Sequence, residues 1–319
     1  MKSDRCSFCG GATFSIFYSG MKDRLGLYKR NFDILSCDSC GSAMLSDTPS
    51  PDELAGLYPA HYIVKDAGRQ GKFFRLWTKA EMSLFYDLMY RKHIREFRKH
   101  TGLYSGRVLD VGCGSGRRIR EFINYGYDAE GIETSQADVE YANSIRIKAR
   151  LGTLTGLDFD ELSFDAITFF NVFEHLPDPV ETAERALRLL KPGGTAYIFV
   201  PVMDGLMPKV FGRRWIEIAE MPRHITIPSI KGMEALGTRA GFKEVVSNSV
   251  SVVNLAHIMA ETLVPASVAS DAYGKKPVVA MATRFAGAVA MLAVLPVAFV
   301  EKYSGLASSR IFVMRKGKQ

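Results

Sequence analysis

Cysteine is scarce in this sequence, and its first residues contain no apolar run. The chain of 319 residues has five cysteines. Residues 1–6 read MKSDRC, so charges and a thiol stand where a secretory signal needs its apolar segment. We therefore expect a cytoplasmic protein whose thiols stay reduced. That environment excludes a disulfide framework and favours cysteines that bind a metal.

The sequence also has no excess of apolar residues and no excess of charged residues. Hydrophobic residues make up 47% of the chain and charged residues 24%, which is the usual mix of a globular protein with a core. The length accommodates one large and one small domain. The formal net charge of +7 permits nucleic acid, a phosphate-bearing metabolite or an anionic membrane as a partner. A basic surface without a specific partner is an equal alternative, and the net charge does not distinguish among these possibilities.

Four of the five cysteines occur in two C-x-x-C-G pairs, which are Cys6 with Cys9 and Cys37 with Cys40. The two-residue gap lets both thiolates reach one metal ion, and glycine permits the tight turn that follows. Two pairs complete a tetrahedral Cys₄ site, so we predict structural zinc and a zinc ribbon over residues 1–46. Iron is the alternative, although no redox-partner motif accompanies the pairs. A closed shell leaves no open position for catalysis, and the ion is expected to stabilise a segment too small to fold alone.

Residues 47–104 are predicted to be a linker followed by an amphipathic helical region. Three prolines in residues 47–64 (Pro49, Pro51 and Pro59) indicate a linker with one short helix. Apolar side chains then recur at helical spacing in residues 72–100, namely Phe73, Phe74, Leu76, Trp77, Leu84, Phe85, Leu88, Met89, Ile94 and Phe97. The basic residues of this segment are interpreted as a solvated face, with a phosphate-binding face as the alternative; they are Arg91, Lys92, Arg95, Arg98 and Lys99.

The most informative segment is residues 107–116, which read RVLDVGCGSG. Its apolar residues predict a buried parallel strand, its glycines a tight turn, and residues 117–125 a helix. In such a unit the backbone approaches a ligand closely, and a dinucleotide would suit it as well. Asp110 inside the strand disfavours a pyrophosphate and favours a ligand with sulfonium and ammonium charges. Glu133, which ends the next predicted strand, is suited to accept hydrogen bonds from both hydroxyls of a ribose.

These residues resemble those of class I S-adenosylmethionine-dependent methyltransferases. Residues 107–116 resemble motif I of that family, and Glu133 matches its ribose-binding acid. Residues 164–179 look like its fourth strand with the turn that follows, and residues 190–194 like the loop before the fifth strand. The resemblance implies an α/β fold with a Rossmann-like sheet of seven strands, whose methyltransferase core we place at residues 105–253.

The same resemblance implies where the cofactor, S-adenosylmethionine, binds. Its contacts would be Asp110, Gly112, Gly114, Glu133, Thr153, Leu154 and Asn171, with Thr153 and Leu154 near the adenine. Cys113 is interpreted as a packing residue. Transfer to an oxygen also requires that the acceptor be positioned and its proton removed. The candidates are His175, beyond the fourth strand, and His224, in the loop after the fifth; a hydrogen-bonded structural role is the alternative for each.

Two departures from related enzymes bear on the acceptor. Ubiquinone-pathway O-methyltransferases have a glutamate before their Glu-His pair, and Asn171 stands in its place here, which argues against a metal-assisted catechol mechanism. An Asn-Pro-Pro-Tyr element, which enzymes acting on base nitrogens often use, is missing. We therefore predict methylation of a small-molecule hydroxyl on a sugar, glycolipid or lipid-linked cell-surface precursor. The alternative is an RNA base methyltransferase that recognises its substrate through the zinc ribbon.

Residues 277–300 are strongly apolar and long enough to suggest a membrane span. Arg284 interrupts the run, and Pro296 lies in the uninterrupted remainder, which is shorter than a span requires. The resemblance predicts paired strands at residues 243–250 and 310–314, and a single crossing between them would separate the pair.

We therefore predict an apolar helical insertion at residues 254–309, followed by a last core strand and tail at residues 310–319. Residues 277–300 are expected to pack on the domain, in a homodimer, or in one leaflet at the inner face of the membrane. The basic flanks would suit an anionic lipid surface; they are Lys275, Lys276, Lys302 and Arg310.

Overall fold

The computed structural model describes residues 4–58, 87–265 and 277–318. The chain forms two compact units, each built from separate segments. The first unit contains residues 1–77, 201–232 and 249–310, and the second contains residues 78–200, 233–248 and 311–319. Of the predictions above, Pro59, the apolar residues between Phe73 and Phe85, and the basic flank Lys275–Lys276 lie outside the described residues.

The second unit is organised around a mostly parallel sheet of seven strands, ordered β6-β5-β4-β7-β8-β11-β10. The strands are β4 (Arg107–Val111), β5 (Asp128–Glu133), β6 (Ala149–Leu151), β7 (Phe164–Phe170), β8 (Leu190–Pro201), β10 (Glu244–Ser249) and β11 (Ser309–Arg315). The pairings among β4 to β8 are parallel. Strands β8 and β11 run antiparallel where Gly193 N donates to Gly317 O and Lys316 N donates to Gly194 O. The predicted Rossmann-like fold is confirmed.

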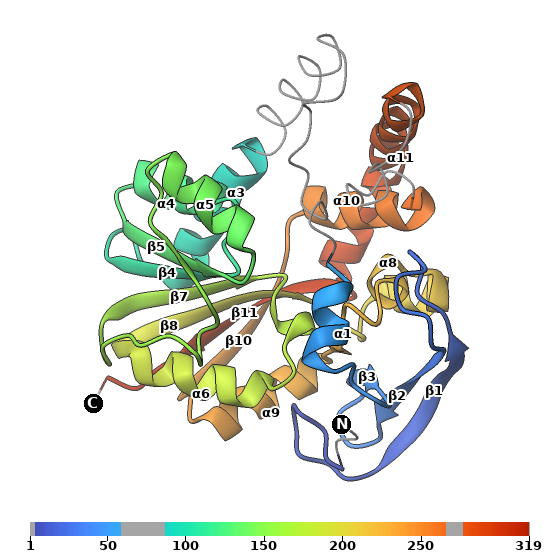
Figure 1. Ribbon diagram of the computed structural model, residues 1–319, viewed down its shortest axis with the longest axis horizontal. Coiled ribbons are helices and arrows are strands. Elements are labelled where there is room, and N and C mark those ends of the chain that lie inside the picture. Colours follow the sequence, from blue (N-terminus) through green and yellow to red (C-terminus); the bar gives the residue numbers. More distant parts are fainter. Residues whose placement is uncertain (1–3, 59–86, 266–276, 319) are drawn as a thin grey trace. The chain divides into compact units, whose positions relative to one another are not determined.

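Helices cover both faces of this sheet, as the parallel connections require. Figure 1 shows α3 (Asp87–Thr101), α4 (Arg117–Asn124) and α5 (Gln136–Ser144) on one face, and α6 (Pro179–Leu189) and α9 (Ile230–Ala240) on the other. Because the central strands are enclosed, their apolar residues are buried without alternation; Val108, Leu109 and Phe169 have no exposed surface.

Helix α3 is the described part of the predicted amphipathic region. Its apolar residues Ile94 and Phe97 are fully buried, and Phe97 meets Phe122 edge to face at 5.2 Å between ring centroids. Arg98 departs from the predicted solvated face, since its guanidinium lies 4.7 Å from the centre of the Tyr125 ring. Residues 190–194 also differ from prediction. They are extended as part of β8 and not a loop, because the chain beyond β11 pairs with them.

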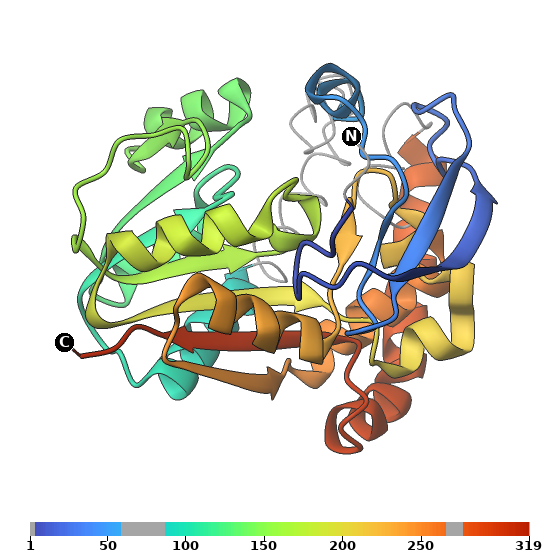
Figure 2. The same ribbon diagram turned by 90° about the horizontal axis from the view of Figure 1, so that it is seen from below.

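The first unit contains an antiparallel sheet of four strands, β1-β2-β3-β9. The first three strands come from the cysteine-rich segment: β1 (Phe14–Met21), β2 (Phe32–Cys37) and β3 (Ala43–Leu45). The fourth, β9 (Thr226–Ile227), comes from a point nearly two hundred residues later and pairs Ala43 with Ile227. Figure 2 shows the blue strands of the N-terminal segment beside the yellow segment that includes residues 201–232.

Helices make up most of the remaining first unit. They are α1 (Pro51–Gly56), α7 (Leu206–Phe211), α8 (Ile216–Ala219), α10 (Val252–Leu263) and α11 (Pro277–Tyr303), with a short 3-10 turn, η4 (Gly212–Arg214). Helix α1 is the short helix predicted in the linker. Helices α10 and α11 form the predicted insertion between β10 and β11. Helix α10 begins at Val252 because the Ser251 hydroxyl caps it, accepting from Asn254 N at 3.2 Å.

Candidate cofactor site and metal centre

The turn after β4 has a backbone shape that only glycine adopts without strain. Gly112, Gly114 and Gly116 have φ values of 69°, 52° and 78°, in the left-handed region. A Cβ atom at Gly112 would lie 2.6 Å from Val172 Cγ2, whereas one at Gly114 would meet no atom of the described residues within 4 Å. The turn therefore packs tightly at Gly112 and presents bare backbone to open space at Gly114.

Glu133, at the end of β5, holds this turn in place. Its Oε2 accepts from Gly114 N at 2.9 Å, and its Oε1 accepts from Thr134 N at 2.7 Å and from Ser135 N at 3.0 Å. Three backbone donors therefore orient a half-buried carboxylate directly beside the open face of Gly114. This places an acceptor for hydroxyl hydrogens next to a backbone that a ligand can approach closely.

Asp110 is fully buried in β4, and its charge is already matched within the protein. Arg118 Nη1 lies 3.1 Å from Asp110 Oδ2, and the Thr168 hydroxyl donates to Oδ1 at 2.7 Å. Burial raises the pKa of Asp110, while Arg118 and Thr168 favour its ionised form. Asp110 therefore does not offer an unpaired negative charge to a cationic ligand, as the sequence had suggested, because Arg118 already pairs with its carboxylate. No motif in the sequence pointed to Arg118.

The other predicted cofactor residues lie at the same edge of the sheet. Asn171 follows β7 in the left-handed conformation, with φ of 55°, and its side chain is exposed. Thr153, just beyond β6, accepts from Gly156 N at 3.0 Å through its hydroxyl, and Leu154 beside it is buried. Because β4 to β7 are parallel, their carboxyl ends meet at one edge, where ligands bind in open α/β sheets. The structure thus brings all seven predicted residues to one edge of one unit.

A short 3-10 turn, η3 (Phe173–His175), follows Asn171 and carries the most unusual carboxyl group of this edge. Glu174 is fully buried, and among the described residues neither of its carboxylate oxygens has a hydrogen-bond partner within ordinary geometry. Burial raises its pKa to about 8, and the nearby Asn171 side chain offsets only part of this shift. A buried carboxyl that is neutral at pH 7 beside a ligand-binding edge is typical of a functional site. The sequence pattern pointed to His175 of this Glu-His pair and not to Glu174.

The raised pKa of Glu174 leads to a specific pH dependence of stability. The folded protein keeps this proton up to about pH 8, whereas the unfolded chain releases it near 4.5. Between these values the unfolded chain binds fewer protons, so the free energy of unfolding falls as pH rises, by roughly 1.4 kcal/mol per pH unit. Glu174→Gln removes the titration. Urea unfolding at pH 5.5 and pH 8, followed by circular dichroism, should show a pH effect roughly 3 kcal/mol smaller in this variant than in the wild type.

Glu181→Gln is a matched control, because Glu181 is an exposed glutamate at the start of α6 in the same unit. It should leave the pH dependence as in the wild type. An identical pH dependence in Glu174→Gln and the wild type would show that Glu174 does not hold a proton near neutrality.

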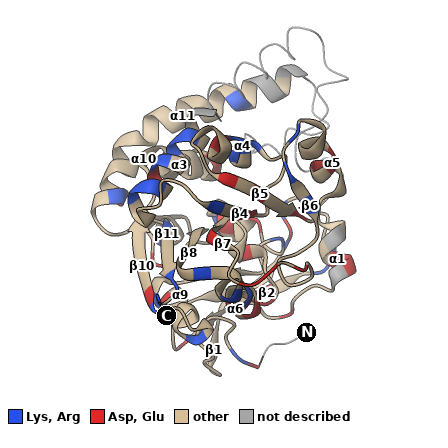
Figure 3. Ribbon diagram, turned by 90° about the vertical axis from the view of Figure 1, so that its left-hand side faces the viewer, with Lys and Arg blue, Asp and Glu red and all other residues tan. Residues whose placement is uncertain are grey.

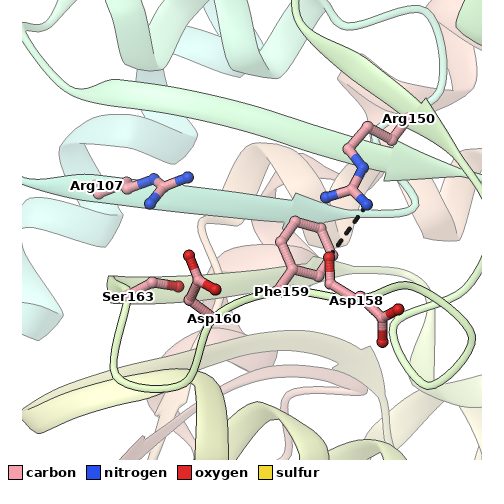
Figure 4. Close-up of a pocket in the computed structure, with 6 residues that line it drawn as sticks. All are labelled: Arg107, Arg150, Asp158, Phe159, Asp160 and Ser163. Carbon is pink, nitrogen blue, oxygen red and sulfur yellow. Dashed lines mark hydrogen bonds between the residues drawn. The ribbon is translucent and has the colours of Figure 1, made fainter.

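A pocket of about 230 Å³ lies away from this edge, between β4, β6 and the loop before β7 (Figure 4). Arg107 and Arg150 line it opposite Asp158 and Asp160, and Arg150 donates to Asp158 O at 3.1 Å. Arg107 is the first residue of β4, so this pocket is not at the carboxyl end of that strand. None of the predicted cofactor residues lines it.

The four predicted metal ligands converge in the first unit. The ligand sulfurs of Cys6, Cys9, Cys37 and Cys40 all lie within 4.8 Å of one another. The Cys6–Cys40 and Cys9–Cys37 sulfur pairs are 3.7 Å and 3.6 Å apart. Four sulfurs at the usual zinc–sulfur bond length of about 2.3 Å would be about 3.8 Å apart in a tetrahedron, so the arrangement fits zinc.

The chemistry of the cysteine cluster also suits a metal. Gly10 and Gly41 follow the two pairs with φ of 77° and 80°, which lets Gly10 N donate to Cys6 O and Gly41 N to Cys37 O. The side-chain hydrogen bond between Cys6 and Cys40 lowers the pKa of Cys40 to about 4 and raises the pKa of Cys6. One thiolate, at Cys40, is therefore favoured within the cluster, and thiolate is the form that binds zinc. Cys113, the fifth cysteine, is buried in the other unit and its pKa is raised by burial.

His224 lies just before β9, the strand that completes the sheet of the cysteine-rich segment. Its Nδ1 lies 2.8 Å from Glu217 O. A carbonyl oxygen only accepts, so Nδ1 carries the proton of the neutral ring and Nε2 has the basic lone pair. The imidazole is buried and therefore fixed in orientation. Trp215, upstream of it, has no exposed surface and belongs to the core.

The residue before His224 links it to the cysteine-rich segment through buried charges. Arg223 has no exposed surface; its Nη1 lies 2.9 Å from Asp23 Oδ1 and its Nε lies 2.8 Å from Glu220 Oε2. Burial opposes ionisation of Glu220, but Arg223 and Arg24 outweigh it and hold its pKa at about 2. A pattern of single charges far apart in sequence carries no local signal, so this network was missed by sequence reasoning.

A second link joins the metal ligands to the start of α9. Ser229 N donates to Ser42 Oγ at 3.0 Å, and the Ser229 hydroxyl donates to Cys40 O at 2.5 Å. A Cβ at Gly232 would lie 2.2 Å from Ser42 Oγ, so only glycine fits there. The metal cluster, β9 and His224 are therefore parts of one hydrogen-bonded assembly within the first unit, whereas His175 belongs to the second unit.

Comparison with known proteins now adds the family. Residues 84–248, about half of the chain, match the family described as methyltransferase domain. The chain belongs to this methyltransferase family. The matched residues include every residue predicted to contact the cofactor. The cysteine cluster and helix α11 lie outside the match.

Curated relatives of this methyltransferase domain include two ubiquinone biosynthesis O-methyltransferases. The protein of Alkalilimnicola ehrlichii is 37% identical over 100 residues, which are 29% of this chain and 40% of that protein. The protein of Xanthomonas oryzae is 33% identical over 103 residues, which are 30% of this chain and 43% of that protein. The chain thus spans less than half the length of these relatives.

A solved structure shows the fold at greater coverage. Phosphoethanolamine N-methyltransferase 2 of Haemonchus contortus, determined with phosphomonomethylethanolamine and S-adenosylhomocysteine, is 16% identical with a TM-score of 0.54. The similarity covers 96% of this chain and 68% of that protein. At this identity the similarity concerns the methyltransferase fold alone.

Proposed function

We propose that this chain transfers a methyl group from S-adenosylmethionine to a hydroxyl oxygen of a small molecule, carried on a sugar, glycolipid or lipid-linked precursor. The observation that carries the proposal is the intact pairing of Glu133 with the open glycine turn at Gly114, in a chain of the methyltransferase family. The curated relatives are named O-methyltransferases, which supports oxygen as the accepting atom.

The cofactor, when bound, supplies an electrophilic methyl group. Residues of the chain orient it: the Gly114 backbone allows close approach, and the Glu133 carboxylate is placed to accept hydrogen bonds from the ribose hydroxyls. The proton of the accepting hydroxyl leaves as the new carbon–oxygen bond forms. His224, with Nδ1 held by Glu217 O, offers Nε2 as the basic atom, and His175 is the second candidate base.

One feature supports an acceptor other than a free catechol. Asn171 replaces the earlier glutamate of the ubiquinone-type segment, so a neutral amide stands where a metal-assisted mechanism would use a carboxylate ligand.

The experiment uses S-adenosylmethionine with a labelled methyl group and the purified full chain. The acceptors are host-extract fractions containing lipids, sugar nucleotides, RNA or protein. Label in the lipid or sugar-nucleotide fraction, absent with Glu133→Ala, is the expected result. The label should resist mild alkali, because methyl ethers survive conditions that hydrolyse methyl esters. Label in RNA would replace this proposal with the RNA alternative, and a cofactor-binding chain that labels no fraction would contradict the proposed activity.

A further inference from the structure

Helix α11 exposes an apolar surface that the cofactor chemistry does not use. Residues Ala282–Tyr303 are long and apolar enough to cross a membrane, yet only 11% of their most apolar window is buried. Two side chains, Phe285 and Leu292, are each 68% exposed. The other large exposed apolar side chains of the helix are Val279, Val289, Val297, Phe299, Val300 and Tyr303. Exposed apolar surface of this extent marks an interaction site.

The first unit holds α11 by its C-terminal half. The Ser249 hydroxyl, just before α10, donates to Lys302 O near the end of α11 at 3.3 Å, so the two helices form an antiparallel hairpin. Helix α10 has 12 residues and spans about 18 Å, whereas α11 has 27 residues and spans about 40 Å. The N-terminal half of α11 therefore extends beyond α10 (Figure 1).

This hairpin geometry argues against a complete membrane crossing. The end of α10 and the end of α11 are both held in the first unit. Near the end of α10, Thr262 Oγ1 accepts from Ile216 N, and near the end of α11, Lys302 O accepts from the Ser249 hydroxyl. If α11 crossed about 30 Å of hydrocarbon, the chain before it would have to cross as well. Helix α10 is too short to do so, and the thirteen residues between Leu263 and Pro277 would span that depth only as extended chain without internal hydrogen bonds.

The charged residues in the sequence around α11 are nearly all basic. Between residues 275 and 310 the sequence has one acidic residue, Glu301, and five basic residues, which are Lys275, Lys276, Arg284, Lys302 and Arg310. Glu301 is fully buried, and its carboxylate accepts from Ser308 N at 2.8 Å. Figure 3 shows α11 almost entirely in the colour of uncharged residues. The helix thus combines an exposed apolar surface with basic residues in the sequence on both sides of it, and its one acid is buried.

This combination of apolar surface and basic charge distinguishes between two possible partners of α11, a second copy of the chain and a lipid surface. In a dimer formed through α11, either orientation would bring basic ends together, since both ends carry the same sign. An anionic lipid surface attracts both ends while its acyl region accommodates the apolar side chains. We propose that α11 lies in one leaflet of an anionic membrane, inserting its exposed apolar side chains without crossing the bilayer.

Vesicle binding by the purified full chain tests this proposal without reference to methyl transfer. Vesicles of phosphatidylcholine with about one-third phosphatidylglycerol should bind the chain at least tenfold more tightly than phosphatidylcholine alone. The double variant Phe285→Ser with Leu292→Ser should bind roughly a hundredfold more weakly. The control variant Ile123→Ser with Val210→Ser removes exposed apolar side chains outside α11 and should bind like the wild type. Cofactor binding and zinc content report that the second and the first unit of each variant are folded.

Depth distinguishes a leaflet-bound helix from a spanning one. Leu292 lies near the middle of α11, so Leu292→Trp places a fluorophore there. Lipids brominated near the headgroup should quench it more strongly than lipids brominated at the chain end. Stronger quenching by the chain-end bromines would overturn the leaflet geometry. A chain that binds no vesicles, or a dimer in sedimentation equilibrium that the Phe285→Ser, Leu292→Ser variant dissociates without any vesicle binding, would overturn the lipid partner itself.

Discussion

Replacing Cys37 by serine is expected to release the zinc ion and abolish methyl transfer while cofactor binding persists. A Cys₄ site contributes folding free energy directly, on the order of 10 kcal/mol for small zinc modules. Its loss should unfold the sheet that β9 shares with β2 and β3, and with it the anchorage of His224. The predicted cofactor residues all belong to the other unit. Metal content by atomic emission, cofactor affinity by calorimetry and transfer of labelled methyl would be measured on one preparation.

Cys113→Ser is the matched control for this experiment. Cys113 is also buried, but it lies outside the cysteine cluster, within the glycine turn, where its side chain is a packing residue. The variant should retain one zinc ion per chain and its activity. If Cys37→Ser lost zinc but kept full methyl transfer, the cysteine cluster would have no part in positioning the acceptor side. Iron in place of zinc in the wild-type protein would contradict the metal assignment itself.

Glu133→Ala is expected to weaken binding of S-adenosylmethionine by at least a hundredfold. Two hydrogen bonds from hydroxyls to a carboxylate contribute roughly 1.5–3 kcal/mol each, and each 1.4 kcal/mol corresponds to a factor of ten. The variant also frees Gly114 N, which loosens the glycine turn. Calorimetric titration with the cofactor gives the affinity, and the product S-adenosylhomocysteine should lose a similar factor because it contains the same ribose.

The control for this position is Glu140→Ala. Glu140 is an exposed glutamate of α5, seven residues further along the chain, and accepts only from Gln136 Nε2 among the hydrogen bonds described for its side chain. Its affinity for the cofactor should match the wild type. An affinity loss below about threefold in Glu133→Ala would remove Glu133 from the cofactor site.

Local patterns in the sequence account for much of the fold. The strand at residues 107–111, the glycine turn and the helix after it were predicted together, because each requires residues that are close in sequence. Each cysteine pair is also a local pattern. The two pairs were predicted to meet because two identical ligand pairs imply one shared ion. The antiparallel end of the sheet and the helical insertion followed from resemblance to the family.

Other features depend on partners far apart in the chain. Residues 190–194 are extended because Gly193 and Gly194 pair with residues 316 and 317, and no pattern near them in the sequence predicts that partner. Strand β9 has two residues, too few for a periodic signal, and exists because β3 is beside it. The buried charge of Arg223 is matched by its neighbour Glu220 and by Asp23, which lies two hundred residues earlier and is brought next to it by the fold.

The sequence by itself determined the family, the glycine turn and the four cysteines of the metal cluster. These features depend on short spacings and on conformations available only to glycine, which residues close together in the chain specify. Tertiary structure alone decided how charges and surfaces are used. Burial without a partner leaves Glu174 neutral near pH 7, and Arg118 matches the charge of Asp110. The tertiary structure also anchors α11 at one end and leaves its apolar side chains exposed. Burial and pairing depend on which distant segments meet, and that information arises only when the chain has folded.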